Sequence, residues 1–254
     1  MSQLAFTNAK ILIGGCDLSA DSNQVTVAVS AKMLNNTVFG MTAESNRAGI
    51  VTSKVDIAGF WDIVATGNPD GLDNTIFAAL GTNDQLLTVF ANGYTEGTST
   101  DKGISLLTTL ASYDAIDGKH GDLLGFKSSI QCRGLPLRSV PLKDATAAMI
   151  TATGNGTKYQ VGAVGATQFL YAGLHVLAYQ GTSPTLAVTI QSDADASAGG
   201  ESTRITFNTV NGATGAQYAT PVAGSITDTF WRATYTIGGS ATPGFRFLVW
   251  MAIV

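Results

Sequence analysis

Alternation of apolar and polar positions dominates the chain and predicts a protein built from β-strands. Val25, Val27 and Val29 alternate with polar or small residues, and this pattern runs on toward Phe39. A period of two places successive side chains on opposite faces of a sheet. Further strands are expected at residues 54–62, 85–90, 104–113 and 123–132, the last two being partners across a turn at 117–122.

The same half of the chain contains one segment with helical spacing. Leu72, Ile76, Phe77 and Leu80 fall on one face of a helix, and Gly81 stands where a helix can end. We therefore expect a single helix near 72–80, after a turn at 67–71. The polar stretches 45–49 and 92–102 are expected to be loops, and Gly59, inside a strand, indicates a bulge or a close approach of two backbones.

The second half alternates more regularly. Its strands are expected at 170–178, 186–190, 204–207, 226–237 and 245–254, with turns rich in Gly, Ser and Thr. Such spacing is typical of an antiparallel sandwich or jelly roll. Pro136, Pro141 and the polar run 151–157 predict a domain boundary near residue 150. The expected fold is all-β and mainly antiparallel with one short helix, divided into domains 1–150 and 151–254.

Charge is scarce along the chain. Only 13% of its 254 residues are charged, about half the usual share, and the net charge is −4. Residues 151–254 contain four basic and four acidic residues, so the excess negative charge lies in the first half. Without a basic stripe, we do not expect tight nucleic-acid binding, whereas loose passage of nucleic acid past a neutral or acidic wall stays open. A surface this neutral suits burial against copies of the same chain and favours assembly over a solitary enzyme.

The sequence shows no targeting segment and only two cysteines, which are far apart. The first ten residues lack a basic-then-apolar signal segment, and the strongly apolar run 247–254 is too short to span a bilayer. We expect synthesis in a cytoplasm and no membrane anchor. Cys16 and Cys132 are interpreted as plain buried residues, with a disulfide between them as the less favoured alternative.

Residues suited to catalysis or metal binding are few. His120 lies in a Gly-rich turn and is expected to be solvated, whereas His175 lies within a strand and is interpreted as a satisfied structural histidine. The segment after Asp17 departs from a calcium loop at Ser22 and Ala28, and is interpreted as an Asx turn. No nucleophile elbow, phosphate-binding loop or zinc spacing occurs, so we expect no enzyme and no cofactor.

Two pairs of adjacent aromatic residues, Phe60-Trp61 and Phe230-Trp231, place their rings on opposite faces of a strand. One ring of each pair is expected in a core and the other against a partner. A carbohydrate-binding module would use such outward rings together with a loop containing Asp193 and Asp195. Trp250, in the apolar last strand, is expected in the core.

The order of elements in 25–133 resembles the tail tube proteins of long, flexible-tailed bacteriophages. The resemblance is carried by a strand leading to Asn36-Thr37-Val38-Phe39-Gly40, a strand ending Ala58-Gly59-Phe60-Trp61-Asp62, the helix after Asp70-Gly71-Leu72, and the strand pair around 118–122. Residues 174–193, 203–207 and 226–232 are similar to stretches of phage virion proteins. The compact tube domain of that family is shorter than this chain, so 151–254 is either tube wall or outer decoration.

The resemblance implies a virion protein, made in the host cytoplasm, whose hexameric rings stack into a hollow tail tube. An inner β-barrel would line a neutral or acidic channel through which DNA only passes, and other tail proteins would be partners. Loop 41–50 is a candidate for contact with the next ring. Candidate subunit contacts are Val25, Val27, Val29, Phe39, Phe60 and Trp61.

Three other functions stay open at this point. The first is a capsid decoration or minor tail protein, which would form trimers or small rings. The second is a carbohydrate-binding or adhesin β-sandwich. The third is a hydrolase with an unrecognised triad.

Overall fold

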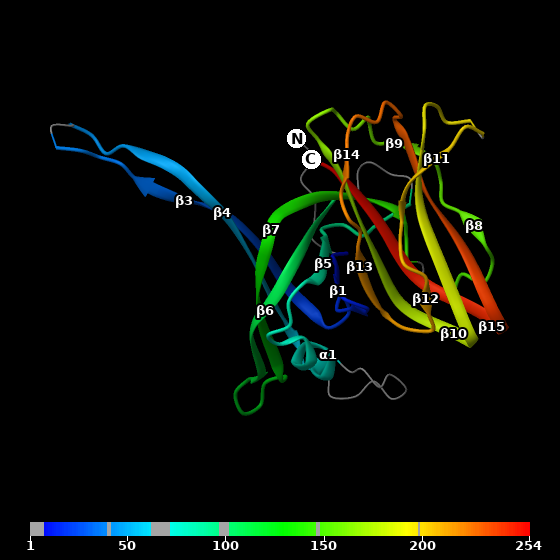
Figure 1. The fold of residues 1–254 in the computed structure, drawn as a ribbon. Helices are drawn as coiled ribbons and strands as arrows, with labels where there is room; N and C mark the ends of the chain where they lie inside the picture. The colour runs from blue at the N-terminus through cyan, green and yellow to red at the C-terminus, as the bar shows by residue number, and fades with distance from the viewer. Residues whose placement is uncertain (1–7, 40–41, 62–71, 97–101, 146–147, 198) are drawn as a thin grey trace. The chain divides into compact units, whose positions relative to one another are not determined.

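A computed structural model describes residues 8–39, 42–61, 72–96, 102–145, 148–197 and 199–254 (Figure 1). The turn expected at 67–71 and the first seven residues lie outside these ranges, as do Met41 and residues 97–101 of the expected loops. The fold is all-β and mainly antiparallel with one short helix, which confirms the fold class expected from the alternation.

The chain forms two compact units. Unit 1 contains Met1–Ala20, Leu86–Ser105 and Leu137–Val254, and unit 2 contains Asp21–Gln85 and Leu106–Pro136. The units therefore interleave along the sequence, and the chain passes between them within β6 and β7 as well as near residues 20 and 85. The division near residue 150 stays a prediction about folding domains, and it is not the boundary that defines these units.

Unit 2 is a four-stranded antiparallel sheet with one helix. Its order is β3-β4-β7-β6, where β3 is Ser22–Asn35, β4 is Asn46–Phe60, β6 is Gly103–Asp117 and β7 is Gly125–Lys143. The expected partners 104–113 and 123–132 are thus neighbouring strands. The stretch 45–49 was expected to be a loop, and this is wrong: β4 begins at Asn46, which pairs with Asn35.

The core of unit 2 lies on one face of this sheet. Val55 is opposite Ile130 and Gly59 is opposite Phe126, and the side chains of Val55, Ile130 and Phe126 are buried. A methyl group on Gly59 would lie 2.0 Å from the carbonyl oxygen of Asp21, so the close backbone approach expected there is confirmed. Only glycine fits this position.

The helix expected near 72–80 is α1, Leu72–Ala79. Gly81 follows it at φ +73°, a conformation that favours glycine and ends the helix. Ile76 is buried, but Phe77 is 67% exposed. Ile76 and Phe77, which were expected on one face of the helix, therefore differ in exposure, because successive positions on a helix differ by 100°.

Unit 1 is organised around two very long strands, β10 (Phe169–Asp193) and β15 (Phe230–Ile253). They pair from Leu170↔Ile253 to Asp193↔Phe230, with register shifts between residues 176 and 185 of β10. The four strands expected at 170–178, 186–190, 226–237 and 245–254 are therefore two. The remaining strands of this unit are β1 (Lys10–Ile13), β2 (Cys16–Asp17), β5 (Gln85–Phe90), β8 (Gly154–Asn155), β9 (Tyr159–Gln160), β11 (Ser202–Thr206), β12 (Val210–Asn211), β13 (Gly215–Tyr218) and β14 (Val222–Ala223).

Both long strands bend at matching places, and the bend creates the core of unit 1. Gly181 and Gly239 have positive φ, and so have Ser183, Ala241 and Thr242. One buried apolar cluster combines side chains from both halves of each strand, including Leu174, Ile190, Trp231, Phe247 and Met251. A strand pair that folds back on itself supplies both layers of a sandwich. Burial of each large side chain in it contributes roughly 1.5–3 kcal/mol.

Candidate self-assembly surfaces

The β3–β4 hairpin continues well beyond the sheet that it belongs to. β4 pairs with β7 only from Lys54 to Phe60, and residues 46–53 of β4 pair with β3 alone among the described residues. We call residues 29–39 and 42–52 the arm; in Figure 1 they form the far part of the blue ribbon. A two-stranded ribbon exposes both faces to water and gains little stability on its own.

One face of the arm is the continuation of the core face of unit 2. The paired residues Val27↔Val55, Val29↔Ser53 and Ala31↔Val51 lie on the same side, and Met33 follows them. Val55 is buried, whereas Val29 is 51% exposed and Met33 57% exposed. The apolar stripe therefore begins in a core and ends in solvent, which is the pattern of a surface that another molecule covers.

The candidate contact residues predicted from sequence lie together in unit 2 but differ in exposure. Val25 and Val27 are half-buried beside the core. Val29, Phe39 and Phe60 are exposed. Their role in contacts between subunits stays a prediction. Five further apolar residues of the arm are exposed but were not among the predicted contacts: Met33, Leu34, Val38, Ile50 and Val51.

Trp61 has a partner inside unit 2. Its indole Nε1–H donates to Asp73 Oδ1 at 3.1 Å, and the Tyr113 hydroxyl donates to the same oxygen at 2.7 Å. Burial, followed by this bond to Asp73, raises the pKa of Tyr113. Asp73 lies in the first turn of α1, so both donors fix the start of the helix to the sheet.

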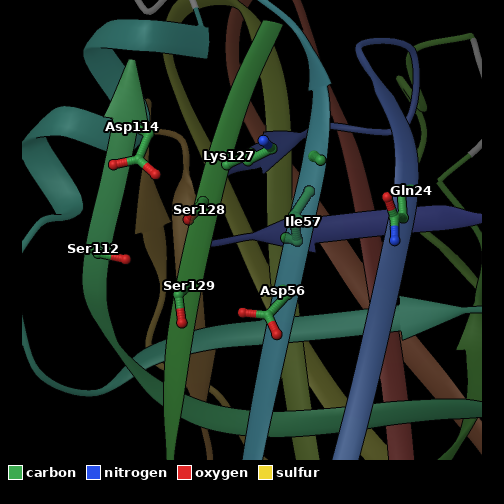
Figure 2. Close-up of a pocket in the computed structure, with 9 residues that line it drawn as sticks. Gln24, Asp56, Ile57, Ser112, Asp114, Lys127, Ser128 and Ser129 are labelled. Carbon is green, nitrogen blue, oxygen red and sulfur yellow. The ribbon is translucent and has the colours of Figure 1, made fainter. Parts of the chain in front are cut away.

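The face of the sheet opposite the core is polar and hollowed. Figure 2 shows its side chains on four adjacent strands: Gln24 on β3, Asp56 on β4, Lys127 and Ser129 on β7, and Ser112 and Asp114 on β6. They line a hollow of about 310 Å³. Lys54 and Asp56 form an exposed ion pair at 2.8 Å, and Lys127 pairs with Asp117. Charges of both signs alternate here without an excess of positive charge.

The outer strands of unit 2 are β3 and β6, and β6 also pairs with β5 along part of its length. Among the described residues β3 pairs only with β4, so its other edge is open. On the β6 edge, Gly81 N donates to the carbonyl of Leu110, and no strand of unit 2 is described beside residues 111–117. An open edge presents unpaired N–H and C=O groups that a strand of another chain can bind.

Unit 1, in contrast, uses its charges internally. The Lys158 ammonium lies 2.7 Å from Asp193 Oδ2 and 3.1 Å from Glu201 Oε1, and it also donates to the carbonyl of Ser197. Arg232 lies 3.1 Å from the same oxygen of Glu201. The Lys158 hydrogen bond holds the pKa of Asp193 below its usual range.

A second ion pair completes this pattern. Arg204 lies 3.0 Å from Asp228 Oδ2, which also accepts a hydrogen bond from Ser192 at 2.6 Å. The Ser192 and Arg204 bonds lower the pKa of Asp228. Three of the four basic residues in 151–254 thus neutralise three of its four carboxylates. The carbohydrate-binding alternative would use the Asp193 carboxylate to bind a sugar. In the structure this carboxylate forms an ion pair with Lys158.

Both histidines match their interpretation from sequence. His120 is exposed, and His175 is fully buried in unit 1. His175 Nδ1 lies 2.8 Å from the carbonyl oxygen of Gly14, and Nε2 lies 2.9 Å from Thr88 Oγ1. Burial lowers the pKa of His175 to about 4. A carbonyl can only accept, so neutral His175 donates from Nδ1 and accepts at Nε2.

The turn after Asp17, two of the tryptophans and the cysteines can be compared with the expectations from sequence. Asp17 Oδ1 accepts from Ser19 N at 3.0 Å, which confirms the Asx turn. Trp231 and Trp250 are fully buried, as expected for one ring of the second aromatic pair and for the last strand. The two cysteines are not joined in a disulfide.

Metal sites and membrane helices were also sought in the part of the chain that is described. No group of three or more His, Cys, Asp or Glu side chains there is arranged to hold a metal ion. None of its helices has the length and apolar character needed to cross a membrane.

Comparison with known proteins gives weak likenesses in structure. No family model and no curated protein matches the chain. Among solved structures, the SPP1 Dit protein, titled a paradigm of the hub adsorption apparatus in phages that infect Gram-positive bacteria, aligns over 97% of this chain and 99% of its own, at 11% identity and a TM-score of 0.39.

Two assemblies align with about half of this chain. A chain of a native gene transfer agent virion matches 50% of this chain and 92% of its own, at 15% identity and a TM-score of 0.35. A chain of the sheath–tube complex of an extracellular contractile injection system matches 52% and 88%, at 8% identity and a TM-score of 0.38. Because all three TM-scores lie below 0.5, nothing about function is carried over from these proteins.

Proposed function

We propose that this chain is a structural protein of a phage-type virion tail whose copies join into rings and stack into a hollow tube. The observation that carries the proposal is the sheet of unit 2, in which β3 and residues 111–117 of β6 each have one side without a described partner strand, and which has an apolar arm at one end. Unpaired N–H and C=O groups at strand edges, together with exposed apolar side chains, suit a protein that assembles with its own copies. The resemblance in the order of elements supports the same role.

Edge-to-edge pairing accounts for the ring. Neighbouring strands in β3-β4-β7-β6 run in opposite directions, so β3 and β6 are antiparallel to each other. When copies stand side by side in the same orientation, β3 of one copy therefore meets β6 of the next in an antiparallel register. Such a head-to-tail contact closes into a ring if the rotation per copy fits, and closure leaves no open edge.

The two faces of the sheet then have different roles. The core face is covered within unit 2 by α1, which leaves the polar face with Gln24, Asp56 and Asp114 to line the channel. Its mixed charges offer no stripe of positive charge for DNA phosphates. In this proposal DNA passes through the tube without being held, the protein has no enzymatic activity, and its partners are its own copies and other tail proteins.

Cysteine pairs placed at the two edges test the ring. Cys16 and Cys132 are first replaced by Ser, and Ala28→Cys on β3 is combined with Cys at Ser112, Asp114 or Ile116 on β6. At least one combination should give, on oxidation, a ladder of covalent multimers that ends at a fixed ring number, expected to be six. Each single-cysteine variant should give no product beyond a dimer.

Two results would contradict the proposal. One is a wild-type protein that stays monomeric by light scattering at about 1 mM. The other is the absence of a ladder from all three combinations while electron microscopy shows no rings. Discrete trimers that do not stack would instead favour a capsid decoration or minor tail protein.

A further inference from the structure

A second hollow lies in unit 1, beside the bend of β10. It has a volume of about 370 Å³ and is lined by Val176 of β10 and by residues of the segment 209–217, which includes β12 and β13. Both of these short strands pair with β10, β12 after its bend and β13 before it (Figure 1). The volume falls within the range of about 300–1,000 Å³ that is usual for small-molecule sites.

The segment that forms the hollow is held in place by hydrogen bonds at its ends and in its middle. The amide of Gln217 accepts from Asn208 N at 2.9 Å and donates to the carbonyl of Asn208 at 2.9 Å, which joins the two ends of 208–217. In the middle, Gly212 N donates to the carbonyl of Pro184 at 2.9 Å.

A third support comes from the turn between β1 and β2. A methyl group on Gly15 would overlap the backbone of Gly215, so this turn packs directly against the segment and only glycine fits there. A loop with supports at its ends, in its middle and along its backbone keeps its shape without a ligand. The cost of ordering the site on binding is therefore small.

The lining of the hollow is polar but uncharged. None of its residues is acidic or basic. The side chains of Thr209, Asn211 and Thr214 are exposed and form no hydrogen bond with another described residue. They offer two hydroxyls and one amide, each of which can donate and accept. These groups suit a ligand that carries hydroxyls, and they provide no opposite charge for a carboxylate, phosphate or ammonium.

An aromatic ring lies beside these polar groups. Tyr179 follows Val176 on β10 and is 44% exposed. Its Cε2 atom lies 3.7 Å from the position that a methyl group on Gly212 would occupy, and Gly212 stands between the lining residues Asn211 and Ala213. A tyrosine ring presents an apolar face on which the C–H groups of a sugar ring can pack.

We propose that this hollow binds a neutral sugar residue of an oligosaccharide or polysaccharide. The hydroxyls of the sugar bond with the free side chains of the segment, and its C–H face packs on Tyr179. The site differs from the one that the carbohydrate-binding alternative takes from sequence, where Asp193 is paired with Lys158. Binding here does not require rings or tubes, so it can be tested separately from assembly.

Saturation-transfer NMR on the full-length chain tests the site, because it detects ligands bound to single chains and to large assemblies alike. The neutral probes are maltotriose, mannotriose, galactotriose and triacetylchitotriose, and the anionic comparison is trigalacturonate. At least one neutral probe should bind with a Kd of about 0.1–10 mM, since one open hollow makes few contacts. Trigalacturonate should not bind.

Three substitutions locate the sugar. Asn211→Ala and Tyr179→Ala should each weaken binding by roughly five- to tenfold, because one removes hydrogen bonds and the other removes the ring. Tyr179→Phe keeps the ring and should keep binding. The matched control is Asn155→Ala, an exposed asparagine of β8 that does not line the hollow, and it should bind like the wild type. All these side chains are exposed, so the variants should fold.

Three results would overturn the inference. The first is a wild-type chain that binds none of the four neutral probes at about 10 mM. The second is binding that Asn211→Ala and Tyr179→Ala leave unchanged, because the sugar then lies elsewhere. The third is stronger binding of trigalacturonate than of every neutral probe, which contradicts a site for uncharged sugars. A chain that binds the sugar at this hollow but forms no rings would instead contradict only the proposed function.

Discussion

The two units differ in how many of their charged and apolar side chains find partners within the unit. In unit 1, scarce charges pair with one another, and only three large apolar side chains among its described residues are exposed: Phe169, Tyr179 and Val254. Among the described residues of the smaller unit 2, fourteen are exposed: seven in the arm, four near the β6–β7 turn (Phe60, Ile116, Leu123 and Leu124), and Phe77, Leu80 and Leu135. Low charge and the need for a partner are therefore separate properties, found in different parts of the chain.

The difference also separates stability from assembly. The sandwich of unit 1 has a large core made by one bent strand pair, whereas the sheet of unit 2 has a small core and two apolar ends. Substitutions in unit 1 should change the free energy of unfolding, and substitutions on the arm should change association.

The largest effect is expected at Phe247, which is fully buried and packs edge-on against Tyr235 with ring centroids 5.2 Å apart. Phe247→Ala should lower the free energy of unfolding by about 3–5 kcal/mol, since it leaves a cavity in the core. The matched change Phe39→Ala, at a fully exposed ring of the arm, should alter it by less than about 0.5 kcal/mol. Urea unfolding of unassembled protein measures both, and equal losses would contradict the division of roles.

A second effect is expected from acid. The pKa of His175 is about 4 in the folded protein because of burial, against an ordinary 6.5. Between these values the unfolded chain binds a proton that the folded chain does not, so stability rises with pH. The contribution is complete above about pH 6.5 and is lost as the pH falls to about 4, a change of about 3 kcal/mol.

The two histidines give a matched comparison for this effect. His175→Gln should flatten the difference in unfolding free energy between pH 7 and pH 4.5, whereas His120→Gln, at the exposed turn of unit 2, should leave it unchanged. An unchanged pH profile in His175→Gln would show that protonation of this residue does not limit the stability of unit 1.

The sequence predicted the strands and the single helix because their signals are local. Alternation at Val25, Val27 and Val29 and helical spacing around Ile76 do not depend on distant contacts. The breaks expected after residues 178 and 237 are the bends of β10 and β15, where Gly181 and Gly239 have positive φ. That one ladder continues across both bends depends on contacts between distant residues, so it was missed. Two-stranded pairing at 45–49 was missed since a ribbon exposed on both faces need not alternate.

The neutral surface of 151–254 is the most instructive difference. Its low charge predicted contact with other copies, but the structure places the exposed apolar residues mainly in unit 2. Pairing of Lys158 with Asp193 and of Arg204 with Asp228 explains the neutrality without any partner. Composition shows how few charges a segment has, and only the fold shows that they lie next to one another.

The smallest effect is expected from ion pairs, and here too a pair from each unit can be compared. Lys158→Met removes an ammonium that is bound by two carboxylates with little exposure, and leaves Asp193 without its cation. Lys127→Met removes an ion pair with Asp117 whose side chains are 62% and 47% exposed. Exposed pairs contribute little.

The melting temperature at pH 7 should therefore fall by several degrees in Lys158→Met and hardly at all in Lys127→Met. The deficit of Lys158→Met should shrink as the pH falls toward 4, because protonation relieves the unpaired carboxylate, while the pKa of Asp193 in the wild type is held low by Lys158. Thermal unfolding at pH 7, 5.5 and 4 measures both variants. Equal losses in the two variants would show that the charges of unit 1 contribute no more to stability than an ordinary surface pair.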